Sequence, residues 1–226
     1  MIDKRVESLE AAVADVKDGA TVLVPGFGAV GIADNLLEAL HDQGAKELTI
    51  VANNAGNGDH GLARLINSGR VRKVICSYPR SGDYSAFLKA YRAKSLELEL
   101  VPQGTISERM RCAAAGLGGF FSPVSAGTKL ADGKEQREID GRLHVFEKPL
   151  KGDIALVKAA KADRWGNLVY RKSARNFNPV CAMAADLTVV EVETMVDLGT
   201  LDPEAVVTPG IFVDRIVVAE PLKIRS

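Results

Sequence analysis

A loop with three regularly spaced glycines stands early in the chain. Gly26, Gly28 and Gly31 give the spacing G-x-G-x-x-G within TVLVPGFGAVGIADNLLEAL, residues 21–40. Glycine allows a positive φ and a close approach of the backbone to a ligand. The N–H groups at the start of the helix that follows favour negative charge. The spacing therefore predicts a turn that binds an anionic ligand, and dinucleotide-binding folds carry the same fingerprint.

The second predicted strand, LTIVA at residues 48–52, bears directly on the dinucleotide interpretation. A dinucleotide site needs an acidic residue at the end of this strand to hold the ribose hydroxyls. The strand ends instead in Asn53 and Asn54, and the nearby acid Glu47 stands at the strand's opposite end. The sequence therefore disfavours NAD binding, which stays an alternative together with a loop that only shapes the turn.

Neutral hydrogen-bond donors follow three of the predicted strands. Besides the glycine loop and the two asparagines, Gln103 follows the fourth strand in the loop PQGT. The carboxyl ends of parallel strands face one crevice, where ligands bind. Amide and glycine N–H donors suit a carbonyl or carboxylate oxygen on which negative charge develops during acyl transfer. We therefore expect acyl chemistry on an anionic or thioester substrate.

Hydrophobic periodicity predicts the elements that position these loops. Short apolar or alternating runs indicate strands, and apolar residues three or four apart indicate helices. In the first half we expect strands at 21–24, 48–52, 71–77 and 96–101, and helices at 6–16, 32–41, 62–67, 84–94 and 107–116. The last third is strand-rich, with strands at 143–148, 154–160, 167–172, 187–193 and 211–219 and one helix at 180–185. Residues 116–141 predict loops and at most a short hairpin.

Strands that alternate with helices predict an α/β fold. Its sheet should be largely parallel and open, with helices on both faces, and its parallel connections should be right-handed. No repeat or linker divides the 226 residues. We therefore expect a single domain over residues 1–226.

The charge balance disfavours two classes of partner. Lys+Arg and Asp+Glu both number 29, so the formal net charge is zero. No global field then attracts nucleic acid or an anionic membrane. The N-terminal residues lack the apolar core of a signal peptide, and no apolar run is long enough to span a membrane. We expect a cytoplasmic protein.

Cysteine and histidine, the usual metal ligands, are few and scattered. The three cysteines are Cys76, Cys112 and Cys181, and the three histidines are His41, His60 and His144. None of them has the spacing of a zinc site or a redox pair. We expect buried thiols in a reducing compartment and no metal site.

Several stretches, in order, resemble the A (alpha) subunit of the family I coenzyme A transferases. DGATVLVPGFGAVGIADNL is similar to the first signature of this family, a Gly-Gly-Phe loop after three apolar residues. Further blocks are NNAGNG, LELELVPQGTISERMR, GGFFSPVSAGT, EIDGRLHVFEKPLKGDIALVKAAKADRWGNLVYRKSARNF and TPGIFVDRIV. The resemblance covers roughly residues 4–218. It implies the α/β fold of the NagB/RpiA/CoA-transferase-like group.

The resemblance also implies a reaction. CoA would move from succinyl-CoA to a 3-oxo acid, with 3-oxoadipate favoured and acetoacetate or a short-chain fatty acid as the alternative. The nucleophile of the family is a glutamate of the B (beta) subunit, in a Ser-Glu-Asn-Gly or Glu-Ser-Gly setting that this chain lacks. Glu108 is interpreted as support for a helix N-terminus, and Glu191 and Glu193 as one face of a strand. No catalytic residue is therefore expected in this chain, and an A2B2 assembly with a B subunit is expected.

The same resemblance assigns site residues. The glycine loop would bind the CoA thioester, a substrate rather than a permanently bound cofactor, through Pro25, Gly26, Phe27, Gly28, Ala29, Val30 and Gly31. Asn53, Asn54 and Gln103 would orient the acyl group and stabilise its oxyanion.

Three positions depart from the family pattern. Pro25 replaces the first glycine of Gly-Gly-Phe and removes a backbone donor. Ala33 replaces a proline near the start of the next helix, where proline is favoured but not required. Ala126 stands where relatives often carry tyrosine. Pro25 and Ala126 bear on the substrate range, which no motif in the sequence reports.

Other features allow two interpretations each. The basic cluster at 171–175 could meet CoA phosphates or the partner, or be a solvated strand end; it comprises Arg171, Lys172 and Arg175. Trp165 and Gly166 predict a packed hairpin corner, and Phe120 and Phe121 either line the acyl pocket or belong to the core. A non-catalytic acyl- or sugar-sensing module on the same fold is the remaining functional alternative.

Overall fold

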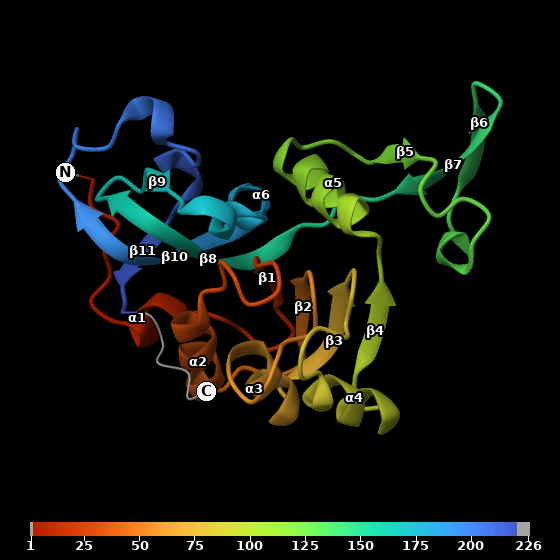
Figure 1. Ribbon diagram of the computed structural model, residues 1–226, viewed down its shortest axis with the longest axis horizontal. Coiled ribbons are helices and arrows are strands. Elements are labelled where there is room, and N and C mark those ends of the chain that lie inside the picture. Colours follow the sequence, from red (N-terminus) through yellow and green to blue (C-terminus); the bar gives the residue numbers. More distant parts are fainter. Residues whose placement is uncertain (1, 221–226) are drawn as a thin grey trace.

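The computed structural model describes residues 2–220 and contains one large parallel sheet (Figure 1). Its strands lie in the order β11-β10-β8-β1-β2-β3-β4, with β9 paired antiparallel to β8. Their bounds are β1 Thr21–Val24, β2 Leu48–Ala52, β3 Val71–Cys76, β4 Glu97–Leu100, β8 Gly152–Asp163, β9 Leu168–Val169, β10 Ala185–Val196 and β11 Arg215–Val218. Every other neighbouring pair in this order is parallel.

The strands that follow β1 in the sequence are added on both of its sides. The chain adds β2, β3 and β4 on one side of β1, and β8, β10 and β11 on the other. The order therefore reverses between β1 and β8. Open α/β sheets bind ligands at the carboxyl ends of strands beside such a reversal.

Helices cover both faces of the sheet, as expected (Figure 1). One apolar core includes side chains of α1 to α4, and the other includes side chains of α5 and α6. The helices are α1 Leu9–Val13, α2 Asp34–Gln43, α3 Gly61–Asn67, α4 Ser85–Arg92, α5 Gln103–Ala114 and α6 Asn178–Met183. Because both faces are covered, a central strand such as β2 is buried at all five residues, as the apolar text LTIVA predicted.

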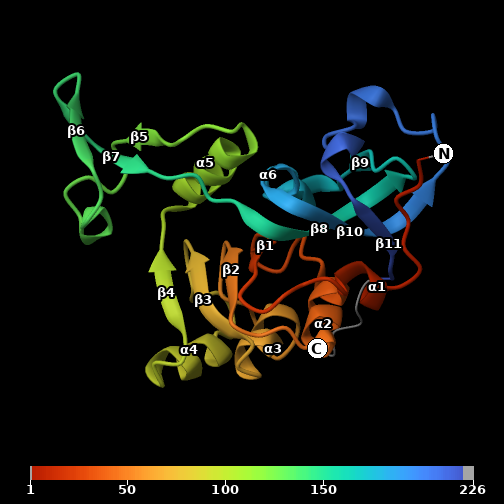
Figure 2. The same ribbon diagram turned by 180° about the vertical axis from the view of Figure 1, so that it is seen from behind.

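A three-stranded antiparallel arm projects from the body (Figures 1 and 2). It consists of β5 Phe120–Ser122, β7 Arg142–Glu147 and β6 Gln136–Ile139, in the order β5-β7-β6, with the short 3-10 helix η1 Lys129–Ala131 in its loop. The two strands within residues 116–141, β5 and β6, do not form the predicted hairpin with each other, because each pairs with β7. The chain turns from β6 into β7 at Asp140 and Gly141, with φ of 51° and 73°. Within the arm, the rings of Phe121 and Phe146 pack against each other. The strand predicted at 143–148 corresponds to β7 and is therefore part of the arm.

Several predicted bounds are wrong. The first helix begins only at Leu9, because Val6 donates its N–H to Ile216 of β11. The strand predicted at 167–172 is reduced to β9 and passes into a 3-10 helix, η2 Lys172–Arg175. The strand predicted at 211–219 begins at Arg215, after the 3-10 helix η4 Gly210–Phe212. A further 3-10 helix, η3, spans Pro203–Ala205.

Helix α5 also begins earlier than predicted. It starts at Gln103, so PQGT is a helix start rather than a loop. Glu108 therefore lies in the middle of α5, where it pairs with Arg111 at 2.8 Å. Its interpretation as support for a helix N-terminus is wrong, because the dipole acts only within the first turn.

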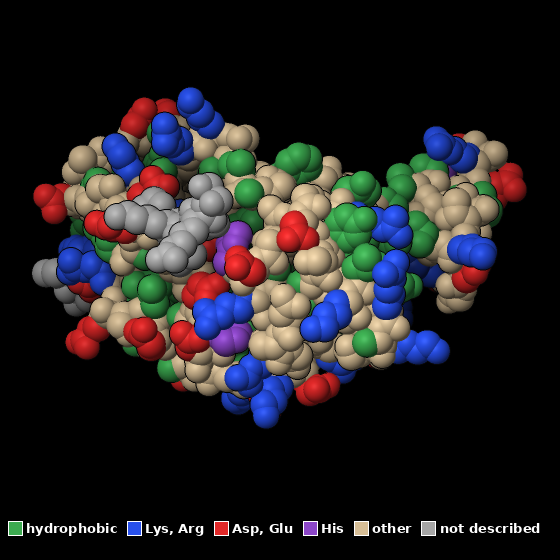
Figure 3. All heavy atoms as spheres, turned by 60° about the horizontal axis from the view of Figure 1, so that its bottom comes forward, with side chains coloured by type: hydrophobic (Ala, Val, Ile, Leu, Met, Phe, Trp, Pro, Cys, Tyr) green, Lys and Arg blue, Asp and Glu red, His purple; other side chains and the backbone are tan. Residues whose placement is uncertain are grey.

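The outer surface over helices α2 to α4 carries interspersed positive and negative side chains (Figure 3). Several form ion pairs, including Arg64 with Glu38. None of the helices within residues 2–220 is both long and apolar enough to cross a membrane.

Candidate active site

The glycine loop after β1 folds into a two-residue hairpin. Phe27 N donates to Val30 O at 3.0 Å, and Val30 N donates to Phe27 O at 3.1 Å. Gly26 and Gly31 have φ of 133° and 78°. A Cβ on Gly26 would lie 2.4 Å from Ile32, and one on Gly31 would lie 2.6 Å from the carbonyl of Ala174. Glycine is therefore required at both ends of the hairpin.

Two asparagines from the last third of the chain hold this loop. Asn176 Oδ1 accepts from Gly26 N at 3.0 Å, and Asn176 Nδ2 donates to Val30 O at 3.0 Å. The fully buried Asn178 donates to Gly31 O at 2.9 Å. These contacts fix the loop to the region between η2 and α6. No single-sequence pattern identified either residue as a site residue, although both lie in the family-like block ending in SARNF or directly after it.

The start of helix α2 is already occupied by a carboxylate of this chain. Glu191 on β10 accepts from Asn35 N at 3.1 Å and from Leu36 N at 3.3 Å. A dinucleotide would place its pyrophosphate on these N–H groups. These N–H groups are not free, so the expectation that this helix start favours a bound anion is wrong. NAD binding, which already lacked an acid after the second strand, also lacks the free helix start that its pyrophosphate needs.

Glu191 belongs to a buried ionic cluster behind the loop. Its side chain is 1% exposed, and its Oε1 lies 2.6 Å from Lys158 Nζ, which is 13% exposed. The side chain of Asn35 donates to the same oxygen at 2.8 Å. Glu191 and Glu193 line the same hollow beside the loop, as expected for one face of a strand, but Glu193 is exposed and forms none of these contacts.

Replacing Glu191 by glutamine should destabilise the protein strongly. The substitution leaves Lys158 as an unpaired buried charge, for which we expect a loss of about 3 kcal/mol in the free energy of unfolding. Differential scanning calorimetry should show a fall of several degrees in Tm. Glu193→Gln is the matched control, with an expected loss below about 0.5 kcal/mol. Equal Tm values for the two variants would contradict the role given to Glu191.

Asn53 and Gln103 lie together at the carboxyl ends of the strands. Asn53 Oδ1 accepts from Gln103 Nε2 at 2.7 Å and from Ser77 Oγ at 2.8 Å. These two donors hold the side-chain oxygen, so the amide orientation of Asn53 is set. Its Nδ2 donates to no described residue, and so keeps both hydrogens for a ligand.

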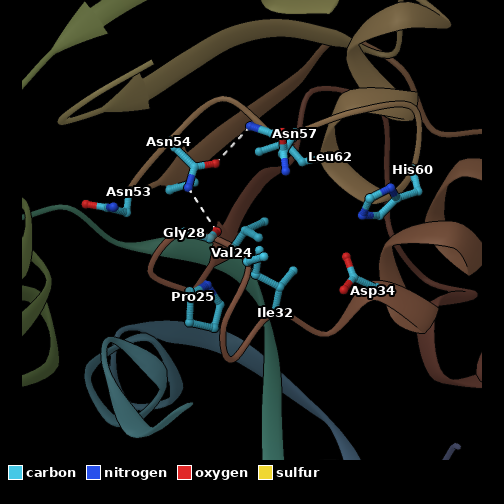
Figure 4. A pocket seen from close by; sticks show the side chains of 14 residues that line it. Val24, Pro25, Gly28, Ile32, Asp34, Asn53, Asn54, Asn57, His60 and Leu62 are labelled. Carbon is cyan, nitrogen blue, oxygen red and sulfur yellow. Dashed lines mark hydrogen bonds between the residues drawn. The ribbon is translucent and has the colours of Figure 1, made fainter. Parts of the chain in front are cut away.

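Asn54 has a different environment. It is 6% exposed, its Nδ2 donates to Gly28 O at 3.2 Å, and its Oδ1 accepts from Gly56 N at 3.0 Å (Figure 4). The side chain thus braces the glycine loop against the loop after β2. The two adjacent asparagines, which look equivalent in the sequence, have distinct contacts.

A cavity of about 180 Å³ lies between the glycine loop and the loop after β2 (Figure 4). Its lining has three parts. Asn53 and Asn54 bring amides, the middle is mainly apolar, and Asp34 and His60 stand at the other end (Figure 4). The apolar residues are Val24, Pro25, Ala29, Ile32, Ala52 and Leu62.

Asp34 is the cavity's perturbed acid. Burial raises the pKa of Asp34 to about 6; nearby Glu191 and Glu38 also raise the pKa, whereas His60 and Lys158 lower it. Neither Asp34 nor His60 was identified from the sequence as a site residue. Each stands at the start of a helix that follows a glycine-containing loop, and that position is the signal that could have identified both.

A second, more open hollow of about 400 Å³ lies on the other side of the loop. Arg171 and Lys172 line it together with Val30 and Gly31, whereas Arg175 does not. None of the three cations forms an ion pair with another residue in the range 2–220. Two of the three predicted basic residues therefore stand beside the loop.

The remaining predicted features are placed as follows. Phe121 packs against Phe146 in the arm, with ring centroids 5.2 Å apart, so it lines neither cavity nor main core. Gly166 forms the β8–β9 corner with φ of 93°, while Trp165 is 47% exposed. The three cysteines are buried and free. Within the described part of the chain, no group of three potential metal ligands comes together.

Comparisons with known proteins give a consistent family. The family described as "Coenzyme A transferase" matches residues 6–219. The chain is 55% identical over 217 residues to the A subunit of 3-oxoadipate CoA-transferase from Pseudomonas putida, covering 96% of this chain and 94% of that protein. It is 48% identical to the A subunit of succinyl-CoA:3-ketoacid coenzyme A transferase from Xanthomonas campestris pv. campestris, covering 95% and 88% of the two chains.

A solved structure supports the fold. The acyl-CoA transferase of E. coli O157:H7, in a thioester complex with CoA, aligns with a TM-score of 0.81 at 24% identity. The alignment covers 96% of this chain and 47% of that chain. The likeness confirms the expected α/β architecture, and the fold described here corresponds to about half of that longer chain.

Proposed function

Because the chain belongs to the coenzyme A transferase family, we propose that it is the A subunit of a CoA-transferase that moves CoA from succinyl-CoA to a 3-oxo acid, with 3-oxoadipate favoured. The observation that carries the proposal is the 55% identity to the A subunit of a 3-oxoadipate CoA-transferase over nearly the full length of both chains. A B subunit would complete the enzyme, in an A2B2 assembly.

The proposed reaction proceeds through the partner's glutamate. The glutamate carboxylate attacks the thioester of succinyl-CoA, which releases the CoA thiolate and leaves a succinyl-glutamyl anhydride; the thiolate then attacks the glutamyl carbonyl, which forms a glutamyl thioester and releases succinate. The carboxylate of the 3-oxo acid attacks this thioester in the same way, and the released thiolate attacks the 3-oxoacyl carbonyl of the new anhydride, which gives 3-oxoacyl-CoA and frees the glutamate. The covalent intermediate divides one difficult exchange into easier steps. Coenzyme A enters as a substrate, and we propose no permanently bound cofactor.

This chain would supply the neutral wall of the site. The free Nδ2 hydrogens of Asn53 would face the acyl oxygen that becomes negative, while Gln103 and Ser77 hold the amide in place. The N–H groups of Gly28 and Ala29 donate to no other residue within 2–220, and they would approach the thioester. Preorganised donors of this kind stabilise a developing oxyanion.

The acids of this chain are poor candidates for the nucleophile. Glu191 is buried in its ionic cluster, and Glu108 lies outside both hollows. Asp34 does line the cavity, but it stands beside His60 and away from Asn53 (Figure 4). The donors that would stabilise an acyl oxyanion therefore lie at the end opposite the only carboxylate among the described lining residues.

The substrate preference can be tested directly. With succinyl-CoA as donor and the B subunit present, kcat/KM for 3-oxoadipate should exceed that for acetoacetate by ~10-fold or more. The reason is that acetoacetate lacks the second carboxylate, so the polar groups that bind this carboxylate are left without a partner. A competition assay with both acids measures the ratio. An advantage for acetoacetate would move the assignment to a ketone-body enzyme, and no exchange at all would favour a sensing module.

Three further features belong to this proposal. Arg171 and Lys172 would contact the phosphates of CoA or the partner from the hollow beside the loop. Residues 1–226 would act as one domain, with the arm as its projecting part. The buried free thiols support a reducing, cytoplasmic location.

A further inference from the structure

The cavity beside the glycine loop has a distinct polarity at each end. Asn53 and Asn54 stand at one end with neutral amides, and Asp34 and His60 stand at the other (Figure 4). Between them lie the apolar side chains of Val24, Ile32 and Leu62 and the ring of Pro25, with the amide of Asn57 beside Leu62 (Figure 4). A ligand that fits this pattern has an acyl group at one end, a short run of methylenes and a polar group at the far end.

The far end is built from two helix starts. Asp34 is the first residue of α2, and His60 is the residue before α3. Part of the backbone at both helix starts is already used, because Glu191 accepts from Asn35 N and Leu36 N, and Glu38 accepts from Gly61 N at 2.7 Å. A ligand group at this end of the cavity would meet the side chains of Asp34 and His60, which both line it.

These two side chains are available for a ligand. No described residue donates a hydrogen bond to the Asp34 carboxylate. The ring of His60 and the carboxylate of Asp34 face one another across the cavity end (Figure 4). The other charges around Asp34 are Glu191, Lys158 and Glu38, and all three are engaged with other residues.

On the basis of the proposed function, we propose that His60 and Asp34 bind the distal carboxylate of a dicarboxylic 3-oxo acid and so determine the preference of the enzyme for a diacid. An imidazole N–H donates to a carboxylate oxygen, and a protonated Asp34 can donate its O–H to the same group.

The geometry also gives the direction of the pH dependence. Burial raises the pKa of Asp34 to about 6, so the carboxyl is protonated below that pH and charged above it. A charged Asp34 repels a second carboxylate. Binding a diacid should therefore take up a proton, and the preference for a diacid should decline as the pH rises from about 5.5 to about 7.5.

The test compares two acids of the same carbon count with the reconstituted enzyme. 3-Oxoadipate carries the distal carboxylate, and 3-oxohexanoate ends in a methyl group instead. His60→Leu should lower the ratio of their kcat/KM values by ~10-fold or more, the loss expected for one hydrogen bond to a charged group. An unchanged ratio would overturn the proposal.

Two further variants separate charge from position. Asp34→Asn keeps a donor and removes the titration, so the ratio should depend less on pH than in the unmodified enzyme. Asp59→Asn removes the same charge from the fully exposed neighbour, whose Oδ1 lies 3.7 Å from His60 Nδ1, and should leave the ratio within about twofold. Identical pH profiles for the Asp34 variant and the unmodified enzyme would contradict the role of Asp34.

A binding measurement keeps this inference separate from the proposed function. The chain has three histidines, so 15N-histidine labelling of this chain alone, in the complex with an unlabelled B subunit, gives a simple NMR spectrum. Adipate should shift the His60 imidazole resonances, and hexanoate should not. If adipate shifts them and no acid is exchanged, the proposed function fails and the inference stands. If exchange occurs but adipate leaves His60 unshifted, only the inference fails.

Discussion

Asn53→Ala is expected to lower kcat of the reconstituted enzyme by ~100–1000-fold, the range for loss of one preorganised oxyanion donor. The reason is the free Nδ2 of Asn53, which Ser77 and Gln103 orient through the side-chain oxygen. Steady-state kinetics with succinyl-CoA and 3-oxoadipate measure the effect, and KM should change less than kcat.

Two neighbouring substitutions serve as comparisons for this prediction. Asn53→Asp keeps the shape but replaces the free donor by an acceptor, so its kcat should be at least as low. Asn54→Ala should lower kcat by ~10-fold or more. It should also lower the free energy of unfolding by about 1–3 kcal/mol, because it leaves Gly28 O and Gly56 N without their partners. Turnover within about twofold of the unmodified enzyme for Asn53→Ala would remove Asn53 from the proposed oxyanion site.

The isolated chain is expected to show no CoA exchange, and the B subunit should restore activity. Acyl exchange through a covalent intermediate needs a carboxylate nucleophile, and we assign it to the partner. Exposed apolar side chains support a large interface of ~2,000 Å² or more in total. They are Phe27 and Val30 at the loop tip and Leu117, Val124, Leu130 and Leu143 in and around the arm.

The isolated chain offers a direct assay of this second prediction. It is incubated with succinyl-CoA, any enzyme thioester is trapped with borohydride or hydroxylamine, and the peptides are analysed by mass spectrometry. The Asp34→Asn chain is the matched sample, because Asp34 is the carboxylate of the cavity. An adduct on an acid of this chain, with turnover and no partner present, would refute the assignment of the nucleophile to the B subunit.

Local patterns were sufficient to predict much of the fold. Apolar runs of four or five residues correspond to the buried central strands, since a strand covered on both faces must be apolar throughout. The glycines at 26 and 31 were also informative, because the positive φ values and close contacts there exclude other residues. The predicted ends of an element are wrong where segments far apart in the sequence pair with each other. Val6 leaves the first helix to pair with Ile216, and only the folded chain brings these residues together.

The site residues divide in the same way, into those whose position local patterns predict and those whose contacts only the folded chain brings together. Asn53 and Gln103 follow predicted strands, so their convergence could be inferred from the parallel sheet, and the structure brings them within 2.7 Å. Asn176 and Asn178 could not be inferred, because their contacts with the glycine loop join residues about 150 positions apart. The same holds for Glu191, whose strand position says nothing about the helix start that it caps.

By itself the sequence determined the order of the strands and helices of the large sheet, the glycine turn, the neutral amides after β2 and the family to which the chain is similar. Only the tertiary structure decided that Glu191 fills the start of α2, that the Nδ2 of Asn53 has no described acceptor while that of Asn54 donates to Gly28 O, and that Asp34 faces His60. The physical reason is that local patterns report the conformation of neighbouring residues. The partner of a polar side chain, in contrast, depends on which buried groups the fold brings within hydrogen-bond distance.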